Sequence, residues 1–343
     1  MTWLLDPLVH GWNALLEYLS AHVLTCLIPA FFIAGAIAVF VSKDAVMKYF
    51  GPKANRLLSY GVASVSGTLL AVCSCTVLPL FTGIYKRGAG LGPAIAFLFS
   101  GPAINLLAIV YSARLLGLDI GIARAVGAIS FSLVVGLLMA MIFRREEQAR
   151  QIQAPALTLS DESEKKPPVL LAYFATLVGI LVFGAAARWW ETGVFAAGLV
   201  IVVGRWFSWA EVKEWLIATW DFSKQIAPWL LGGVFIAGMI RAYMPQSWIV
   251  STVGDNSLIS NLTASVVGAF FYFATLTEVP IVKSFMDLGM DKGPVLALLL
   301  AGPALSLPNM LVIRSVLGTR KTVAYVALVI GLATLAGMFF GSL

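Results

Sequence analysis

The sequence predicts an all-α, polytopic membrane protein whose two structural repeats have inverted topology and contain broken or re-entrant helices. Three observations predict this class: the composition, the apolar stretches and an internal duplication. Hydrophobic residues make up 60% of the 343 residues and charged residues only 12%, and the mean hydropathy is +0.92. A soluble domain of this length needs more polar residues to cover its surface, so the composition indicates that lipid surrounds the protein.

The apolar stretches have the length of membrane helices, because about 20 residues span the hydrocarbon core of a bilayer. Few stretches contain an internal charge, and an open chain in lipid satisfies its backbone only as a helix. We therefore expect about 8–10 membrane segments. The stretches are approximately 21–42, 57–84, 91–116, 121–143, 169–187, 192–205, 226–243, 257–282, 293–317 and 321–342.

Charge divides the chain into four expected parts. Residues 1–143 form the first membrane repeat, and 144–168 form a polar, charge-dense linker that we expect to be cytoplasmic. Residues 169–225 hold connecting membrane segments and an interfacial helix, and 226–343 form the second repeat. The interfacial helix is placed at 205–224, where four tryptophans lie among charges, although a simple connector fits this stretch equally well.

The two repeats are visible as a duplication within the chain. Residues 57–117 and 258–318 align without a gap at an offset of 201. Chance matches in hydrophobic sequence involve Leu and Ala, whereas these matches involve mainly Gly, Pro, Ser and Thr. The matched pairs are Ser64/Ser265, Gly67/Gly268, Thr76/Thr277, Pro79/Pro280, Gly88/Gly289, Gly92-Pro93/Gly293-Pro294, Gly101-Pro102-Ala103/Gly302-Pro303-Ala304 and Gly117/Gly318, with Phe32–Gly35/Phe235–Gly238 upstream at a slightly different offset.

The basic loops indicate how the first half is oriented. If every apolar stretch crossed the membrane once, the basic loop at 43–56 would lie opposite the 144–168 linker. If 57–84 or 91–116 is instead a re-entrant hairpin, both basic segments face the cytoplasm, as the positive-inside rule requires.

The same scheme inverts the second half. The loop at 244–257 contains Asp255 but no Lys or Arg, so it is expected outside, whereas Arg320 and Lys321 are expected inside. Inverted halves of this kind occur in many secondary transporters.

Prolines inside the apolar stretches predict helix breaks at corresponding positions of the two halves. A proline donates no backbone hydrogen bond, and in lipid the freed carbonyl must be satisfied by protein or by a water-filled cavity. A kinked helix is the alternative for one isolated proline, but paired interruptions point to a central binding site. The predicted break residues are Pro79, Gly101, Pro102, Pro280, Gly302 and Pro303.

Two cysteines just before the first break are candidate substrate ligands. Cys73 and Cys75 are two residues apart, so their thiols converge only if the backbone near Pro79 is unwound. Converging sulfurs suit a soft, thiophilic ligand or a redox exchange. The alternative is that they are small packing residues, since the second half has Ala274 and Leu276 at these positions.

Glu278 is the candidate for proton coupling, because a carboxylate well inside an apolar stretch is costly and often marks a proton pathway. A buried, neutral, hydrogen-bonded acid is the alternative. Lys283 follows five residues later, either as its partner or as an interfacial side chain. The polar side chains that line the site or cap freed backbone groups are Thr76, Asn105, Thr277 and Asn309.

Several classes of function find no support in the sequence. It contains no G-x-S-x-G, Walker or dinucleotide-binding motif and no His/Glu metal pair, so we expect no enzyme, cofactor or metal site. The net charge of +6 comes from Lys and Arg that lie mostly between apolar stretches, so nucleic acid is not an expected partner. The stripe of Ala333, Gly337 and Gly341 predicts close helix packing within the chain or in a homo-oligomer.

Several motifs carry a resemblance to a known family over nearly the whole chain. They are Cys73-Ser-Cys-Thr-Val-Leu-Pro79, Gly92-Pro93, Ser100-Gly-Pro-Ala-Ile-Asn105, Thr277-Glu-Val-Pro280 and Ala301-Gly-Pro-Ala304. With them the chain resembles the bacterial YraQ-like group of predicted permeases, which includes the ArsP organoarsenical efflux permeases. The resemblance implies a secondary permease of the inner membrane. In the efflux members, cysteines are thought to bind trivalent methylated or aromatic arsenicals and ion antiport to drive export, which points here to Cys73 and Cys75 and secondarily to Glu278.

Two functions remain open at this stage. The first is a secondary permease that moves a small thiophilic or anionic solute or a metalloid through a central site between the repeats, with efflux of trivalent organoarsenicals as the leading example. The second is a transmembrane thiol–disulfide electron carrier that works with a thioredoxin-like partner, and the apolar residues Ala274 and Leu276 argue against it. A channel is a third alternative.

Overall fold

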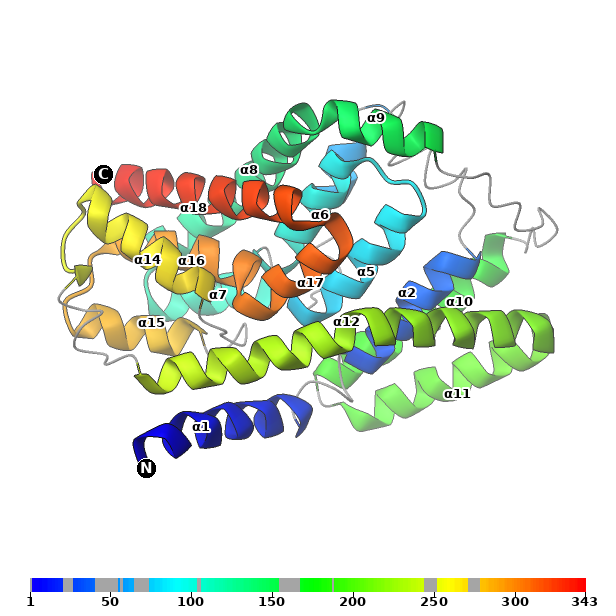
Figure 1. Cartoon of the computed structure of the whole chain (residues 1–343). Coiled ribbons are helices and arrows are strands. Elements are labelled where there is room, and N and C mark those ends of the chain that lie inside the picture. The colour runs from blue at the N-terminus through cyan, green and yellow to red at the C-terminus, as the bar shows by residue number, and fades with distance from the viewer. Residues whose placement is uncertain are drawn as a thin grey trace.

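The computed structural model describes residues 2–20, 27–40, 55, 58–64, 74–103, 106–153, 167–186, 188–243, 252–270 and 278–343. Within these ranges the chain is helical apart from short turns and contains no β-strand, which confirms the all-α class. The helices drawn in Figure 1 are α1 (Thr2–Tyr18), α2 (Ile28–Phe40), α5 (Ser74–Lys86), α6 (Leu91–Ala103), α7 (Leu106–Leu115), α8 (Leu118–Ile142), α9 (Arg144–Gln153), α10 (Pro167–Ala185), α11 (Trp189–Trp206), α12 (Trp209–Tyr243), α14 (Leu258–Phe270), α15 (Glu278–Asp287), α16 (Lys292–Leu305), α17 (Leu307–Leu317) and α18 (Thr319–Gly341).

Of the roughly 8–10 expected membrane segments, two to four can be recognised by length and composition among the described helices. By length and composition, α8 and α18 are each able to cross a membrane, and α6/α7 and α16/α17 are bent pairs that add up to two further spans. Helix α6 is buried along its whole length, whereas α8 and α18 expose large apolar side chains such as Val126 and Phe339. Exposed apolar side chains on outer helices around a fully buried inner helix are typical of a protein surrounded by lipid.

Ion pairs define the two ends of the bundle, which we call the Glu147 face and the Asp119 face. At the Glu147 face, Oε1 of Glu147 accepts hydrogen bonds from Tyr85 Oη at 2.8 Å and from Lys321 Nζ at 2.6 Å. At the Asp119 face, Lys292 Nζ lies 2.6 Å from Asp119 Oδ2. The two ion pairs, Glu147–Lys321 and Lys292–Asp119, each join a helix of the first half of the chain to a helix of the second. The helix ends that they join therefore lie at the same face of the bundle.

The two halves run in opposite directions between these faces. Helix α8 starts at the Asp119 face, and α18 starts at the Glu147 face with Lys321 in its first turn. Helix α6 starts near the Glu147 face, where Gly92 lies against Gly136 late in α8, and α16 starts at the Asp119 face with Lys292. The matched segments α6–α7–α8 and α16–α17–α18 are therefore antiparallel, which confirms the inverted repeat.

Each inverted segment is preceded by a stretch whose two described ends lie at the same face, and we call this stretch the re-entrant hairpin of that half. In the second half, Asn256 just before α14 donates to Met338 O, and Asp291 just after α15 donates its backbone N–H to Val253 O. Helix α14 thus begins, and α15 ends, at the Asp119 face. In the first half, Tyr60 packs against Gly92, and α5 ends next to Tyr85, both near the Glu147 face. Both described ends of the 57–84 stretch therefore lie near the Glu147 face, as the predicted re-entrant hairpin at 57–84 requires, and residues 65–73 between them lie outside the described residues.

Equivalent hydrogen bonds in the two halves explain why Ser64 and Ser265 are matched in the duplication. Ser132 Oγ donates to Ser64 Oγ at 3.0 Å in the first half, and Thr334 Oγ1 donates to Ser265 Oγ at 3.1 Å in the second. In each half the re-entrant hairpin is therefore tied by a serine to the long helix that follows.

The turns after the hairpins require glycine. Gly88 and Gly289 have φ values of 101° and 110°, and Gly117 and Gly318 have φ values of 120° and 81°. A residue with a Cβ is strained in this region, so these two matched pairs are conformational requirements of the inverted fold.

Residues 205–243 differ from the sequence prediction. The expected interfacial helix at 205–224 and the apolar stretch at 226–243 lie mostly in one helix, α12, which continues through Pro228 for 35 residues. At 1.5 Å per residue it is about 52 Å long, more than the hydrocarbon core of a bilayer. The boundary expected at 225–226 therefore falls inside a helix, because contacts with α1, α2 and α17 support α12 along its length.

Helices α1 and α2 pack on α12 in a reciprocal way. Trp215 Nε1 donates to Phe32 O at 2.8 Å, while Gly11 lies against Phe235 O. Phe32 and Phe235 are matched in the duplication. Helix α12 of the second half therefore corresponds in position to α1 and α2 of the first half. Figure 1 shows both α1 and α2 lying along α12.

Candidate functional site

The helix breaks after the Gly-Pro pairs lie inside the bundle. Helix α16 ends at Leu305, directly after Gly302-Pro303, and α17 starts at Leu307, so the break is at Ser306, which is buried. The axes of the two helices differ by 46°. Helix α6 likewise ends at Ala103, directly after Gly101-Pro102.

The other two prolines do not interrupt a described helix. Pro79 lies inside α5, and Pro280 lies in the first turn of α15, which begins at Glu278. A proline in the first turn loses no hydrogen bond, because the N–H at that position has no partner within the helix. Helices α5 and α15 run on from these prolines, whereas residues 65–73 and 271–277 before the two helices lie outside the described residues, so the breaks expected near Pro79 and Pro280 stay predictions.

A buried ion pair lies beside the second break. Arg124 Nη2 of α8 is 2.9 Å from Glu278 Oε2 of α15, and the exposed fractions of the two side chains are 0% and 1%. Arg124 Nη1 also donates to Ser112 Oγ of α7 at 2.9 Å, and Ser112 Oγ donates to Ala108 O at 2.7 Å. The pair therefore joins three helices and connects the first half to the second.

The local sequence explains why the carboxylate fits there. Glu278 is the first residue of α15, where the N-terminal end of the helix dipole favours a negative charge. A Cβ on Gly302 would lie 3.0 Å from Glu278 Oε1, so the absence of a side chain at the Gly-Pro break makes room for the carboxylate. At the matched positions, Gly101 makes room for Val77 in the same way.

The ion pair is not a requirement of the duplicated fold. At the offset of 201, Arg124 corresponds to Tyr325 and Glu278 corresponds to Val77. Tyr325 is fully buried, and its hydroxyl reaches Ala304 O at 3.4 Å. One of two equivalent places in the molecule therefore carries charge and the other does not.

The site retains unused hydrogen-bonding capacity among the described residues. Arg124 Nε and Glu278 Oε1 are buried without a hydrogen-bond partner in that part of the chain, and so are Ser306 Oγ and Asn309 Oδ1 next to the break. Buried polar atoms normally have partners, so an unpaired one needs an explanation, and a bound polar group is one of them. The arrangement can therefore bind a polar group or exchange a proton.

The structure brings only some of the predicted site residues together. Glu278 and Gly302 are in contact, and Thr76 and Asn309 are buried in α5 and α17. Cys75 belongs to the first turn of α5, at the end of that helix remote from the Glu147 face. Cys73, Asn105, Thr277 and the side chain of Cys75 lie outside the described residues.

The sequence interpretation missed Arg124, and of its two readings of Lys283, a partner of Glu278 or an interfacial side chain, the first is not what the structure shows. Lys283 pairs instead with Asp287 at 2.6 Å on the exposed side of α15. The available signal was that Arg124 is an internal charge in the apolar stretch 121–143, and such residues usually face the bundle interior and pair. Its partner lies 154 residues away, so no local pattern connects the two.

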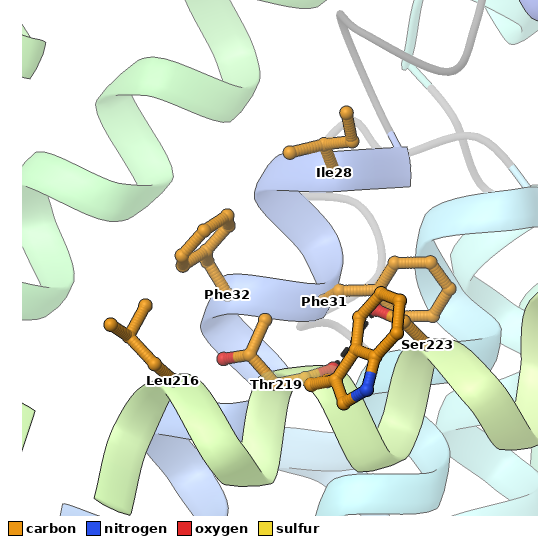
Figure 2. Close-up of a pocket in the computed structure, with 7 residues that line it drawn as sticks. Ile28, Phe31, Phe32, Leu216, Thr219 and Ser223 are labelled. Carbon is orange, nitrogen blue, oxygen red and sulfur yellow. Dashed lines mark hydrogen bonds between the residues drawn. The ribbon is translucent and has the colours of Figure 1, made fainter. Parts of the chain in front are cut away.

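A groove of about 300 Å³ lies on another part of the molecule, between α2 and α12. Figure 2 shows Phe31 and Phe32 on one side and Leu216 and Thr219 on the other. Thr219 Oγ1 donates to the carbonyl of its own helix at Trp215, so the lining is effectively apolar. This groove has no charged group and is separate from the Arg124–Glu278 pair.

Comparison with known proteins identifies relatives over the whole length. Residues 8–342 match a family described as a predicted permease (ArsP_1). The chain is 45% identical to the UPF0718 protein MJ0584 of Methanocaldococcus jannaschii, over 96% of this chain and 94% of that protein. It is 24% identical to the UPF0718 protein YraQ of Escherichia coli, over 88% of this chain and 74% of that protein.

A third relative, from Streptococcus mutans, is named as a candidate subunit of a two-component membrane permease complex, and it is 23% identical over 86% of this chain and 83% of that protein. No solved structure matches the chain. Because the family match covers nearly every residue and the archaeal relative is similar from end to end, this chain belongs to the predicted permease family of membrane proteins.

Proposed function

We propose that the protein is a secondary permease of the cell inner membrane that moves a small solute through a central site at the helix breaks. The leading substrate in this proposal is a thiophilic species such as a trivalent organoarsenical, exported from the cell. The observation that carries the proposal is the buried, incompletely bonded polar site between two inverted halves. Sites of this kind are where many secondary transporters with inverted repeats bind substrate.

The sulfur of the site would come from the first half alone. Cys75 is in the first turn of α5, which is the inner end of a re-entrant hairpin. A cysteine at a helix N-terminus is favoured as the thiolate, which is the form that binds soft metalloids. Cys73, Thr76, Asn105, Thr277 and Asn309 complete the proposed lining, and Glu278 is the proposed proton-coupling residue.

We place the Glu147 face in the cytoplasm. The first turn of α18 with Arg320 and Lys321 lies at this face beside α9, which begins the charged linker, and the basic end of α5 joins them there. Lys and Arg accumulate on the cytoplasmic side of membrane proteins. The expected positions of Arg320, Lys321 and the linker on one side are consistent with this assignment.

Transport into everted membrane vesicles tests the substrate. Uptake of trivalent phenylarsenite is measured by arsenic mass spectrometry with a proton gradient present. We expect Cys73→Ser and Cys75→Ser each to reduce the initial rate at least tenfold, because a hydroxyl is a poor ligand for a soft metalloid. Cys26→Ser is the matched control and should transport like wild type. Uptake that is unchanged in both site variants would exclude the thiol site.

The alternative electron carrier gains no support from the described residues. Such a protein would use reactive sulfur in both halves, and the matched positions hold Ala274 and Leu276. Assembly with a second component or a second copy remains part of the permease proposal, in view of the name given to the Streptococcus mutans relative. Light scattering of the purified protein measures its mass in detergent, and a monomer would exclude the homo-oligomer.

A further inference from the structure

Four charged side chains are buried in the described part of the chain, and they form two pairs. Glu147 and Lys321 pair at one face of the bundle. Arg124 and Glu278 pair between the two halves, with exposed fractions of 0% and 1%. The second pair is therefore the charged feature that a solute passing between the halves would meet.

The charge of this site restricts what it can bind. The guanidinium of Arg124 does not lose its proton in proteins, so it stays positive. If Glu278 alone took up a proton, Arg124 would remain as a buried cation without a counterion, which is strongly unfavourable. Protonation of Glu278 is therefore expected to require an anion that replaces the carboxylate on Arg124.

We propose that Arg124 binds a small monoanionic substrate and that Glu278 is the internal counterion that leaves Arg124 by taking up a proton. One proton then binds to the carboxylate for each monoanion that binds to the guanidinium, and the net charge of the site stays at zero. This inference rests on the proposed permease function and names the substrate class of the same site. A thiophilic solute fits it as a monoanion or when it carries a carboxylate.

The contacts of the pair support an exchange of anions. Arg124 Nε and Glu278 Oε1 are without hydrogen-bond partners among the described residues, so both groups can accept a new partner. Ser112 Oγ holds Nη1 of the guanidinium in place from α7. Gly302, which has no side chain, lies directly beside Glu278 Oε1.

No other charged group on the described neighbouring helices takes the place of either partner. Helix α7 carries Arg114 and Tyr111, and both are exposed. Lys283 of α15 pairs with Asp287, and Lys292 at the start of α16 pairs with Asp119 at the bundle end. Tyr325 and Val77 at the matched positions show that the repeat folds without this charge pair.

The test measures anion binding and proton uptake together. Purified full-length protein in detergent is titrated with formate, acetate and nitrate, which are planar monoanions that match the guanidinium fork. Calorimetry in two buffers of different ionisation enthalpy gives the number of protons taken up per anion bound. We expect one proton per anion in wild type, with the apparent affinity rising tenfold for each unit decrease in pH, because binding is linked to one proton.

The variants separate the two roles. Glu278→Gln should bind the anion without proton uptake and without pH dependence, because its side chain is neutral at every pH. Arg124→Gln should lose binding at least a hundredfold, and Arg124→Lys should restore part of it through its point charge. Asp119→Asn removes the charge of an exposed pair five residues away on the same helix and should behave as wild type.

Three results would overturn the inference: binding that persists in Arg124→Gln, binding in wild type without proton uptake, or no binding of any of the three anions to Glu278→Gln. A double variant, Arg124→Gln with Glu278→Gln, removes both charges and serves if Arg124→Gln alone does not fold. Phenylarsenite uptake by a wild-type protein that binds none of the three anions would reject this inference and leave the permease standing. Anion-linked proton uptake in a protein that moves no arsenical would reject only the proposed substrate.

Discussion

At the scale of single residues, the buried Arg124–Glu278 ion pair costs far more free energy to break than an exposed ion pair contributes. Both side chains are almost completely buried, so each loses its hydration on folding and depends on the other for compensation. Asp119 and Lys292 form a pair at a similar distance, but their side chains are 45% and 57% exposed. Exposed pairs contribute about 0–1 kcal/mol, whereas breaking a buried pair costs about 3–5 kcal/mol.

We therefore expect Arg124→Met to lower the free energy of unfolding by about 3–5 kcal/mol, because it leaves a buried carboxylate without a counterion. The double variant Arg124→Met/Glu278→Leu should recover most of this loss, since two apolar side chains need no counterion. The measurement is equilibrium unfolding of the detergent-solubilised protein, with Asp119→Asn as the control that changes stability by less than about 1 kcal/mol. Equal losses in the single and double variants would show that the pair is not the cause.

At the scale of elements, the small-residue stripe of α18 is used within the chain. The backbone at Gly337 approaches Gly293 O and Asn261 Oδ1, and Gly341 lies against Asn256. Lipid provides no hydrophobic driving force for helix association, so membrane helices are held together by close packing. Small residues such as glycine allow the two backbones to come close enough for that packing. The sequence left open whether the stripe packs within the chain or between subunits, and these contacts answer that it packs against the second half itself.

Helix α18 also provides a matched pair of glycines for a test. A Cβ at position 337 would lie 2.2 Å from Asn261 Oδ1 and 2.6 Å from Gly293 O, whereas at position 331 it meets nothing within 4 Å. We expect Gly337→Ala to lower stability by about 1–3 kcal/mol through overpacking. Gly331→Ala should be neutral or stabilising by up to about 1 kcal/mol, because Ala favours the helix. Thermal unfolding of the two variants in one detergent measures the difference, and equal midpoints would contradict the packing.

At the scale of the whole molecule, the inverted halves place the two re-entrant hairpins at opposite faces. The first hairpin enters from the Glu147 face and the second from the Asp119 face, and ion pairs between the halves lie at both faces and between them.

Single cysteines test this topology directly. Gln148→Cys and Arg320→Cys lie near the Glu147 face, and Leu288→Cys and Leu343→Cys lie near the Asp119 face, all at exposed positions. We expect a membrane-impermeant maleimide to label the first two in everted vesicles and the last two in right-side-out cells. The protein without added cysteines reports background labelling. Labelling of Arg320→Cys and Leu288→Cys from one side would rule out the inverted arrangement.

Much of the architecture could be predicted from local sequence. Gly88, Gly289, Gly117 and Gly318 mark turns with positive φ, and their spacing revealed the duplication before the fold was known. Glu278 was recognised because a carboxylate in an apolar stretch is unusual. The extent of α12 was not predicted, since the tryptophans and charges at 205–224 suggested an interfacial helix separate from the apolar stretch at 226–243, and α12 joins most of the two in one helix that packs against α1, α2 and α17.

The sequence by itself determined that the chain lies in a membrane, that it is duplicated, and that its halves contain Gly-Pro breaks. These are properties of composition and local backbone chemistry, which act over a few residues. Only the tertiary structure decided that both described ends of the 57–84 stretch lie at one face, that Arg124 pairs with Glu278, and that the repeat keeps this charge at one of two equivalent places. Arg124 and Glu278 are 154 residues apart in the sequence and meet only because the two inverted halves pack together. Each charge is buried there, so each needs the other as its counterion.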